Sequence, residues 1–323
     1  MKKQLVLTFI IVLISCTKET TIPEIPIVQT PLNEYKITPS ATDAAITAFN
    51  NEHYVYLSTQ AVPKNKLFVF LPGTSSSPIY YTTILKKAAS MGYHTIGLMY
   101  PNSTDIYNNS SNNTDNTQFG KCRLEAFEGI NHTSGVSIDA TNCIKNRLVK
   151  LLNYLQTQNP SQNWQQFLTG SNIDWGKCVV AGHSQGGGHA FFIAKQVAVA
   201  RAISFSSIDW NTALATNADW VTQTGATPIS KFYSLNHFQD EIFNYVLVQT
   251  QLSNMSLTGP VTSIDVVSSP YNNSHILSTN AIPAYPLLFP FHNSLCINAY
   301  VPKEASGNTI ASFDKAWEYL IGN

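Results

Sequence analysis

The segment with the clearest chemical content is Gly-His-Ser-Gln-Gly at 182–186, which follows the apolar run at 177–181. With a β-branched run before it and a helix-compatible run at 189–198 after it, the segment fits the pattern G-x-S-x-G. In this pattern the chain turns sharply from a strand into a helix, and the serine at the apex has a strained backbone. Glycines flank the serine because side chains there would collide with neighbouring backbone. The pattern predicts that Ser184 is a nucleophile.

A serine hydroxyl is a weak nucleophile at neutral pH and needs a base, usually a histidine that a carboxylate orients. The intermediate of acyl transfer also carries a negative oxygen, which needs backbone N–H groups aimed at it. The residue after the nucleophile supplies one such group, and here that residue is Gln185. The alternative interpretation is an ordinary glycine-rich turn with an incidental serine.

Strands are expected where β-branched and aromatic residues form short apolar or alternating runs, and helices where apolar residues recur every three to four positions. The expected strands are 53–58, 66–71, 93–99, 178–181, 202–206, 231–235 and 261–267. The expected helices are 80–91, 139–158, 189–200, 241–251 and 311–321. Because the two types alternate, we expect an α/β fold with a mostly parallel central sheet and helices on both faces. Insertions are expected near 102–138 and 208–228.

The order of these elements resembles that of the α/β-hydrolase superfamily over about residues 50–322. Residues 68–74 (Phe-Val-Phe-Leu-Pro-Gly-Thr) look like the strand that leads to the oxyanion loop of that family, and 91–101 look like its next strand. The segment Gly-His-Ser-Gln-Gly-Gly at 182–187 is similar to the nucleophile elbows of its lipases and esterases. The resemblance implies that Thr74 supplies the second backbone N–H of an oxyanion hole.

The same resemblance implies the chain order nucleophile, acid, histidine, so the acid is sought after Ser184. Asp240 is the expected acid because it follows the strand expected at 231–235, where the family places this residue. Asp209 is the alternative, since some lipases place their acid one strand earlier. Glu241 is instead expected in the first turn of a helix.

Two histidines compete for the role of base. His275 is favoured because it lies a few residues past the last expected strand, where the family carries its histidine. His292 is the alternative, in a loop rich in aromatic residues and proline, where it could equally be a polar residue of the surface or pocket wall. His183 is expected to pack within the elbow, and His237 to neighbour the acid.

Residues 1–16 have the pattern of an export signal. Two lysines precede a short apolar run at 5–14, and Leu-Ile-Ser-Cys at 13–16 resembles the lipobox of bacterial lipoproteins, whose cysteine becomes a lipidated N-terminus. An ordinary secretory signal and a short membrane anchor are the alternatives. We expect a lipid anchor at Cys16, which would hold the protein in the cell envelope at the inner or the outer membrane.

A proline-containing flexible tether is expected over 17–40, followed by one catalytic domain over 41–323. The formal net charge is zero and only 12% of residues are charged, which disfavours a nucleic-acid partner. No zinc-binding, phosphate-binding or dinucleotide motif occurs, so we expect no metal and no cofactor. Of the three disulfide pairings open to the four remaining cysteines, Cys122–Cys143 is favoured because the two bracket one insertion.

Together these patterns predict an exported serine hydrolase that cleaves a small-molecule or polymeric ester, with an amide less favoured, through an acyl-enzyme on Ser184. A lipoprotein that binds a ligand on the same fold without catalysis is the alternative, because a fold does not by itself establish an activity. A peptidase or acyltransferase on this scaffold is a third possibility. Oligomeric state has no signature in the sequence.

Overall fold

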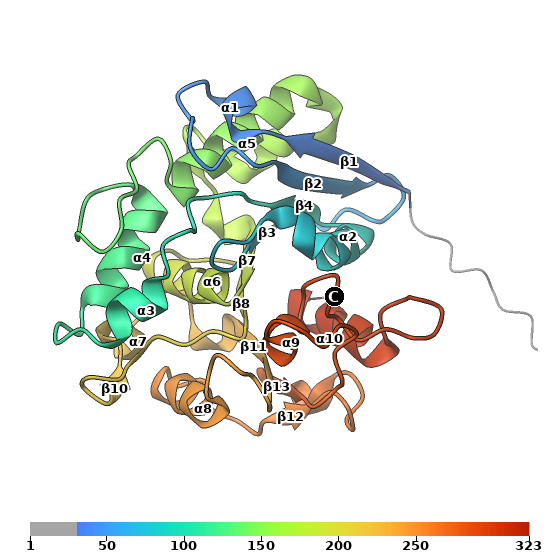
Figure 1. Ribbon diagram of the computed structural model, residues 1–323. Coiled ribbons are helices and arrows are strands. Elements are labelled where there is room, and N and C mark those ends of the chain that lie inside the picture. Colours follow the sequence, from blue (N-terminus) through green and yellow to red (C-terminus); the bar gives the residue numbers. More distant parts are fainter. Residues whose placement is uncertain (1–30, 323) are drawn as a thin grey trace, which may run out of the picture.

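The computed structural model describes residues 31–322, and its ribbon is shown in Figure 1. A nine-stranded central sheet carries helices on both faces, so the chain has an α/β architecture. The expected export signal and the lipidation residue Cys16 lie outside the described residues. Among residues 31–322, no helix combines the length and apolar character that crossing a membrane requires.

The strands of the central sheet are β1 (Leu32–Ile37), β2 (His53–Ser58), β3 (Leu67–Leu71), β4 (His94–Gly97), β7 (Cys178–His183), β8 (Arg201–Phe205), β11 (Phe232–His237), β12 (Thr262–Ser263) and β13 (Ile276–Thr279). The longer helices are α2 (Thr82–Ser90), α4 (Gln118–Glu128), α5 (Ile144–Gln158), α6 (Gln185–Gln196), α8 (Tyr245–Asn254) and α10 (Ala311–Ile321). The shorter helices are α1 (Pro39–Thr42), α3 (Ile106–Ser111), α7 (Asp219–Thr222) and α9 (Pro290–Asn293). Two small hairpins pair β5 (Leu168–Thr169) with β6 (Asn172–Ile173) and β9 (Trp210–Asn211) with β10 (Thr216–Asn217).

The strand order in the central sheet is β1-β2-β4-β3-β7-β8-β11-β13-β12. The pairs β1–β2 and β2–β4 are antiparallel, and every other neighbouring pair is parallel. The expectation of a mostly parallel sheet is therefore confirmed. In such a sheet the carboxyl ends of the parallel strands meet at one edge, where loops can bring distant residues together.

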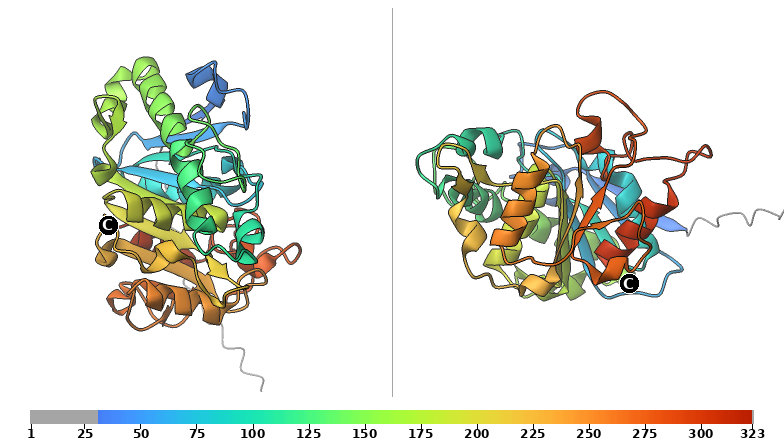
Figure 2. Two further views of the ribbon diagram at one scale, coloured as in Figure 1. Left: turned by 90° about the vertical axis from the view of Figure 1, so that its left-hand side faces the viewer. Right: turned by 90° about the horizontal axis from the view of Figure 1, so that it is seen from below.

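Side chains of β3 alternate between two cores, as the pleat of a strand requires. Leu67, Val69 and Leu71 pack on one face in the core that includes α4, α5, α6 and α8. Phe68 and Phe70 pack on the other face in the core that includes α2 and α10. The two views in Figure 2 show helices on either side of the sheet. The buried run at 67–71 thus reads as apolar throughout because both of its faces are covered.

Residues 102–138, where an insertion is expected, contain the helices α3 and α4. Two expectations about the chain need correction. The expected tether is too long, because residues 32–37 form β1 and pair with β2 along its whole length. Finally, the expected Cys122–Cys143 disulfide is wrong, because both thiols are buried and unbridged.

The last part of the sheet also differs from the expectation. The run at 261–267 was the last expected strand, yet only β12 forms there, as a two-residue edge strand. The strand that pairs with β11 is β13, which comes later in the chain. This shift changes which histidine reaches the carboxyl edge of the sheet.

Candidate active site

Ser184 stands between β7 and α6 with φ 54° and ψ −123°, a strained conformation for a residue with a side chain. Its backbone N–H donates to the carbonyl of Phe205 at 2.9 Å, which ties the turn to β8. A Cβ on Gly186 would lie 2.0 Å from the carbonyl oxygen of Leu71, and one on Gly182 would lie 2.3 Å from the backbone of Gly186. The turn therefore needs glycine on both sides of the serine.

Four residues of the candidate site lie at the carboxyl edge of the central sheet. Thr74 lies just beyond β3, Ser184 beyond β7, Ser206 beyond β8 and Asp240 beyond β11. These four strands are consecutive neighbours and parallel. Topology alone thus brings the predicted nucleophile, the predicted acid and the predicted oxyanion loop to one edge.

The backbone N–H groups of Thr74 and Gln185 are available to a ligand, because within residues 31–322 neither has a hydrogen-bond acceptor. The side chain of Gln185 connects the two loops that carry these N–H groups to the segment that begins α3. Its Oε1 accepts from the Thr74 hydroxyl at 3.1 Å and from the backbone N–H of Ile106 at 3.0 Å. Two free amides held in fixed loops are the arrangement that an oxyanion hole requires.

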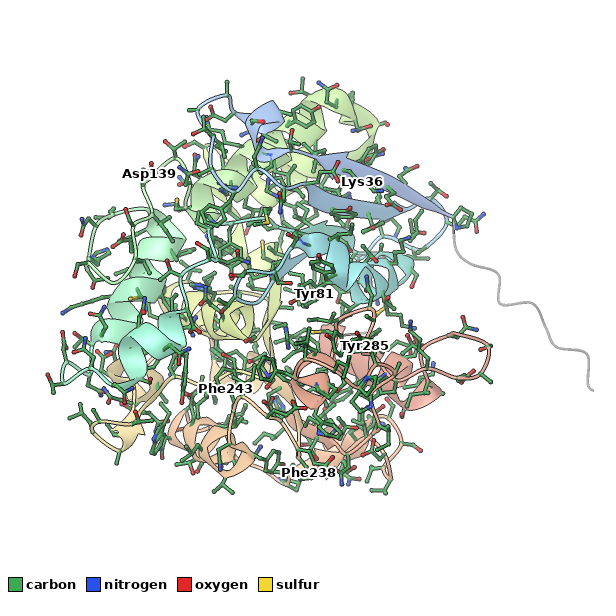
Figure 3. The ribbon with its side chains drawn as sticks, in the orientation of Figure 1. Lys36, Tyr81, Asp139, Phe238, Phe243 and Tyr285 are labelled. Carbon is green, nitrogen blue, oxygen red and sulfur yellow. The ribbon has the colours of Figure 1, made fainter. Side chains whose placement is uncertain are left out.

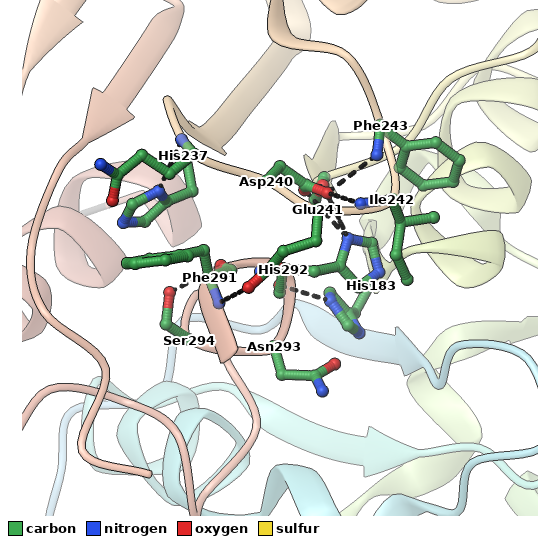
Figure 4. A network of polar contacts seen from close by, with 12 residues as sticks. His183, His237, Asp240, Glu241, Ile242, Phe243, Phe291, His292, Asn293 and Ser294 are labelled. Atoms are coloured by element: carbon green, nitrogen blue, oxygen red, sulfur yellow. Dashed lines mark hydrogen bonds and ion pairs between the residues drawn. The ribbon is translucent and has the colours of Figure 1, made fainter. Parts of the chain in front are cut away.

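Asp240 forms a buried pair with His292 (Figure 4). The Nδ1 of His292 lies 2.9 Å from Oδ2 and 3.1 Å from Oδ1 of the carboxylate. The hydroxyl of Ser206 donates to Oδ2, and the backbone N–H groups of Ile242 and Phe243 each donate to Oδ1 at 2.9 Å. The side chains of the histidine and the acid are only 2% and 4% exposed. The carboxylate is therefore almost fully buried and fixed by several donors.

The charge of Asp240 determines which ring nitrogen of His292 carries a proton. Burial raises the pKa of this carboxyl group, but the positive field of His292 and the hydrogen bonds from that ring, Ser206 and Phe243 outweigh burial and lower the pKa to about 2. The carboxylate is thus ionised at neutral pH and can only accept hydrogen bonds. Because Nδ1 donates to it, Nε2 is the nitrogen left with a lone pair whenever the ring carries a single proton. This is the tautomer that can act as a general base.

His183, in the nucleophile turn, holds the main chain of His292. Its Nε2 donates to the carbonyl oxygen of His292 at 3.0 Å. Burial and the neighbouring His292 ring lower the pKa of His183 to about 3, so its ring is neutral and Nδ1 accepts from the Tyr81 hydroxyl at 3.1 Å. The Tyr81 oxygen in turn accepts from the backbone N–H of Gly73 at 3.2 Å. One chain of hydrogen bonds therefore links the oxyanion loop, the nucleophile turn and the histidine.

A cavity of about 450 Å³ opens at this edge of the sheet, which is within the size range of small-molecule sites. Ser184, His292, Thr74 and Gln185 all line it. Its aromatic walls are Tyr80, Tyr81, Tyr107, Phe243 and Phe289, and Figure 3 labels two of them, Tyr81 and Phe243, near the centre of the molecule. The cavity therefore brings a serine hydroxyl, an imidazole and two free amides together beside an apolar wall.

The expectation that His275 lies beside the acid is wrong. His275 directly precedes β13, so it sits at the amino edge of the parallel sheet, opposite to the nucleophile. There its ring stacks on Tyr233 with centroids 4.2 Å apart, and its Nδ1 lies 2.9 Å from the carbonyl oxygen of Phe232. The alternative residue, His292, is the histidine that the structure brings to Asp240.

Asp209, the alternative acid, has a structural partner instead. Its two carboxylate oxygens accept from Nε and Nη2 of Arg123, each at 2.5 Å, and its Oδ2 also accepts from the Trp220 indole at 2.9 Å. Arg123 and Asp209 are both almost fully buried. Nη1 of Arg123 then donates to the carbonyl oxygen of Gln185 at 3.0 Å. The pair therefore ties α4 to the first residue of α6 rather than orienting a histidine.

No sequence pattern marks Ser206, because a serine at the end of a strand is common. Its backbone has φ 47°, unusual for a residue with a side chain, and its hydroxyl reaches Asp240. His237 neighbours the acid as expected, because its carbonyl oxygen accepts from the backbone N–H of Asp240 at 3.3 Å, while its Nε2 lies 3.0 Å from the carbonyl oxygen of Ala281. Within residues 31–322, no three His, Cys, Asp or Glu side chains cluster closely enough to hold a metal ion.

No known protein family matches this chain, and no curated protein matches it at a significant level. Function must therefore be inferred from the chain's own residues. Those residues supply a strained serine, a buried acid–histidine pair and two unpaired amides around one cavity.

Proposed function

We propose that the chain is a serine hydrolase that cleaves a carboxylic ester through an acyl-enzyme on Ser184. In this proposal His292 is the general base, Asp240 orients it, and the N–H groups of Thr74 and Gln185 form the oxyanion hole. The observation that carries the proposal is that the buried pair of Asp240 and His292 lines the same cavity as a serine held in a strained strand-to-helix turn. Strained residues and buried acid–histidine pairs concentrate at catalytic sites.

The reaction proceeds in two balanced halves. Nε2 of His292 takes the proton of the Ser184 hydroxyl while Oγ bonds to the ester carbon, and the carbonyl electron pair moves onto the oxygen that the two amides stabilise. That pair returns as the bond to the leaving oxygen breaks, and His292 gives its proton to that oxygen, which departs as the alcohol. Water then repeats both steps on the acyl-enzyme and releases the acid. Asp240 stays ionised throughout and stabilises the imidazolium.

We also propose that the domain belongs to the α/β-hydrolase superfamily. The support is the segment pattern at 68–74 and 182–187, together with a mostly parallel sheet in which β3 and β7 are neighbours. A catalytic histidine in the segment after the last strand suits this assignment, and His292 lies beyond both β12 and β13.

The lining of the cavity favours an uncharged acyl group. Arg123 is the only arginine or lysine among the described lining residues, and Asp209 already neutralises it. Asp105 also lines the cavity and would repel an anionic group. We therefore propose a neutral ester with an apolar portion that packs on the aromatic wall.

The proposed setting is the cell envelope, with the protein anchored by lipid at Cys16. Support comes from the sequence at 1–16 alone. Metabolic labelling with radioactive palmitate tests it: label should enter the wild-type chain and not the Cys16→Ser variant. Equal labelling of both chains would contradict the anchor.

The experiment that tests the activity measures the hydrolysis of p-nitrophenyl acetate, butyrate and octanoate, and of the anionic mono-p-nitrophenyl succinate, by the detergent-solubilised full chain. Wild type should hydrolyse the neutral esters, and Ser184→Ala should lower turnover by about 10³-fold or more. Ser171→Ala, which removes an exposed hydroxyl elsewhere, is the matched control. Full turnover by Ser184→Ala would overturn the proposal, and no turnover by a folded wild type would favour the non-catalytic binding protein.

A further inference from the structure

We infer that Glu241 is a positioning residue that fixes the catalytic histidine through its backbone, while the adjacent Asp240 fixes the ring. This inference rests on the proposed function, because it is that proposal which assigns His292 the role of base. It concerns a residue for which the sequence predicts only a place in the first turn of a helix.

His292 lies in a segment with little regular structure of its own, so other residues must hold it in position. It belongs to α9, a helix of only four residues, rather than to the end of a strand. The two residues before this helix, Leu288 and Phe289, both have φ 57° and are 73% and 53% exposed. A helix this short is not stable on its own and takes its position from its contacts.

Glu241 provides two of those contacts (Figure 4). Its Oε1 accepts from the backbone N–H of Phe291 at 3.0 Å, and its Oε2 accepts from the backbone N–H of His292 at 2.9 Å. N–H groups in the first turn of a helix have no partner within the helix, so an external acceptor satisfies them. A carboxylate is the strongest such acceptor among side chains. Both oxygens of one side chain therefore hold the main chain of α9 at the histidine.

Among residues 31–322, the Glu241 carboxylate makes no hydrogen bond or ion pair other than these two. The helix it was expected to begin, α8, starts only at Tyr245. That helix has its own cap, because the side chain of Asn244 accepts from the backbone N–H groups of Val246 and Leu247 at 2.9 and 3.3 Å. The Glu241 carboxylate is therefore not needed to cap α8, and it accepts hydrogen bonds from α9 instead.

The result is that His292 is held from three directions. Asp240 holds its ring, Glu241 holds its N–H, and His183 holds its carbonyl oxygen. Because the two acids are consecutive residues, any displacement of their loop moves the ring and the main chain of the histidine together. Since Asp240, Glu241 and His183 all lie outside the exposed loop before α9, we expect them to hold His292 in place whatever the conformation of that loop.

Loss of Glu241 should affect catalysis more than stability. The side chain is exposed, so water can replace it at the two N–H groups, and the free energy of unfolding should change little. The bond between the ring and Asp240 would remain, but the main chain could shift. Since an error of about 1 Å in the position of a reacting group costs about 100-fold in rate, kcat should fall by about 10- to 100-fold.

The test compares Glu241→Ala, Glu241→Gln and the control Glu128→Ala, whose carboxylate pairs with His132 away from the cavity. With p-nitrophenyl butyrate, Glu241→Ala should lower kcat and leave KM unchanged. Glu241→Gln should recover part of the loss, because its amide oxygen can still accept from one N–H group. Hydrogen exchange of the segment 288–294 should accelerate in Glu241→Ala and stay unchanged in Glu128→Ala.

The inference is overturned if Glu241→Ala retains the wild-type kcat, or if exchange in 288–294 does not change. A purely structural role predicts a lower Tm with an unchanged kcat for the folded enzyme, and that result also overturns it. If the wild type hydrolyses no ester, the proposed function fails, and the exchange measurement alone then decides whether Glu241 fixes this segment.

Discussion

Asp240 and His292 lie 52 positions apart in the sequence, yet Oδ2 of the first and Nδ1 of the second are 2.9 Å apart. The acid follows β11, whereas the histidine lies on α9, far beyond the end of β13. No other aspartate or glutamate of residues 31–322 forms a hydrogen bond or ion pair with the ring of His292. In the proposed mechanism this pairing is what makes His292, rather than His275, the base.

Replacing the two competing histidines should separate their roles. His292→Ala should lower kcat by about 10²- to 10⁴-fold, because it removes the general base. His275→Ala should leave kcat within about twofold, because its ring stacks on Tyr233 at the opposite edge of the sheet. Steady-state hydrolysis of p-nitrophenyl butyrate by both variants measures this. A larger loss of kcat in His275→Ala than in His292→Ala would instead identify His275 as the base.

The ionisation of Asp240 should appear in the pH dependence of stability. Its pKa falls from an ordinary value of 3.8 to about 2 in the folded chain, so the ionised form stabilises the fold above about pH 4. That contribution, about 2 kcal/mol, should be lost as the pH falls from about 4 to about 2.

Urea unfolding at several pH values measures this effect against Asp240→Asn, which cannot titrate. The gap in unfolding free energy between wild type and variant should be larger at about pH 5 than at about pH 2. A gap that does not depend on pH would show that Asp240 keeps its ordinary pKa.

We expect Asp209 to contribute to the stability of the folded chain. Asp209→Asn leaves Arg123 buried without a charged partner, which should lower the unfolding free energy by about 3–5 kcal/mol. Asp174→Asn, which breaks a more exposed pair with Lys177, should cost about 1 kcal/mol or less. Urea titrations of both variants give these values. A stable Asp209→Asn protein without turnover would instead make Asp209 the catalytic acid.

The nucleophile turn should not tolerate a side chain at Gly186. A Cβ there would lie 2.0 Å from the carbonyl oxygen of Leu71, whereas the nearest atom to a Cβ on Gly176 is Oδ1 of Asp174 at 3.4 Å. Gly186→Ala should therefore lower the unfolding free energy by about 2 kcal/mol or more, while Gly176→Ala should change it little. Differential scanning calorimetry of the two variants provides the comparison. Equal Tm values would contradict the geometry of the turn.

Local patterns predict much of this fold. The buried run at 67–71, the turn at Ser184 and the amphipathic helix at 311–321 can be recognised because each has its own apolar pattern or glycine requirement. The choice between His275 and His292 could not be made in this way. The run at 261–267 is a stronger local strand pattern than Ile276–Thr279, yet pairing with β11 selects the latter.

The contacts that complete the candidate site depend on segments that meet only in the folded chain. Glu241 reaches a helix 50 positions away, and His183 reaches a carbonyl 109 positions away. Neither residue has a neighbouring sequence pattern that encodes this role. Such positioning contacts are therefore visible only in the structure.

Labelling with a fluorophosphonate tests the central claim most directly, because the reagent forms a stable phosphonyl bond with an activated serine. Peptide mass spectrometry of the labelled full chain should place a single adduct on Ser184. The adduct should be absent in Ser184→Ala, strongly slowed in His292→Ala and unchanged in His275→Ala. A folded wild-type chain that does not react, or an adduct that persists in Ser184→Ala, would contradict the claim that Ser184 is a nucleophile activated by His292.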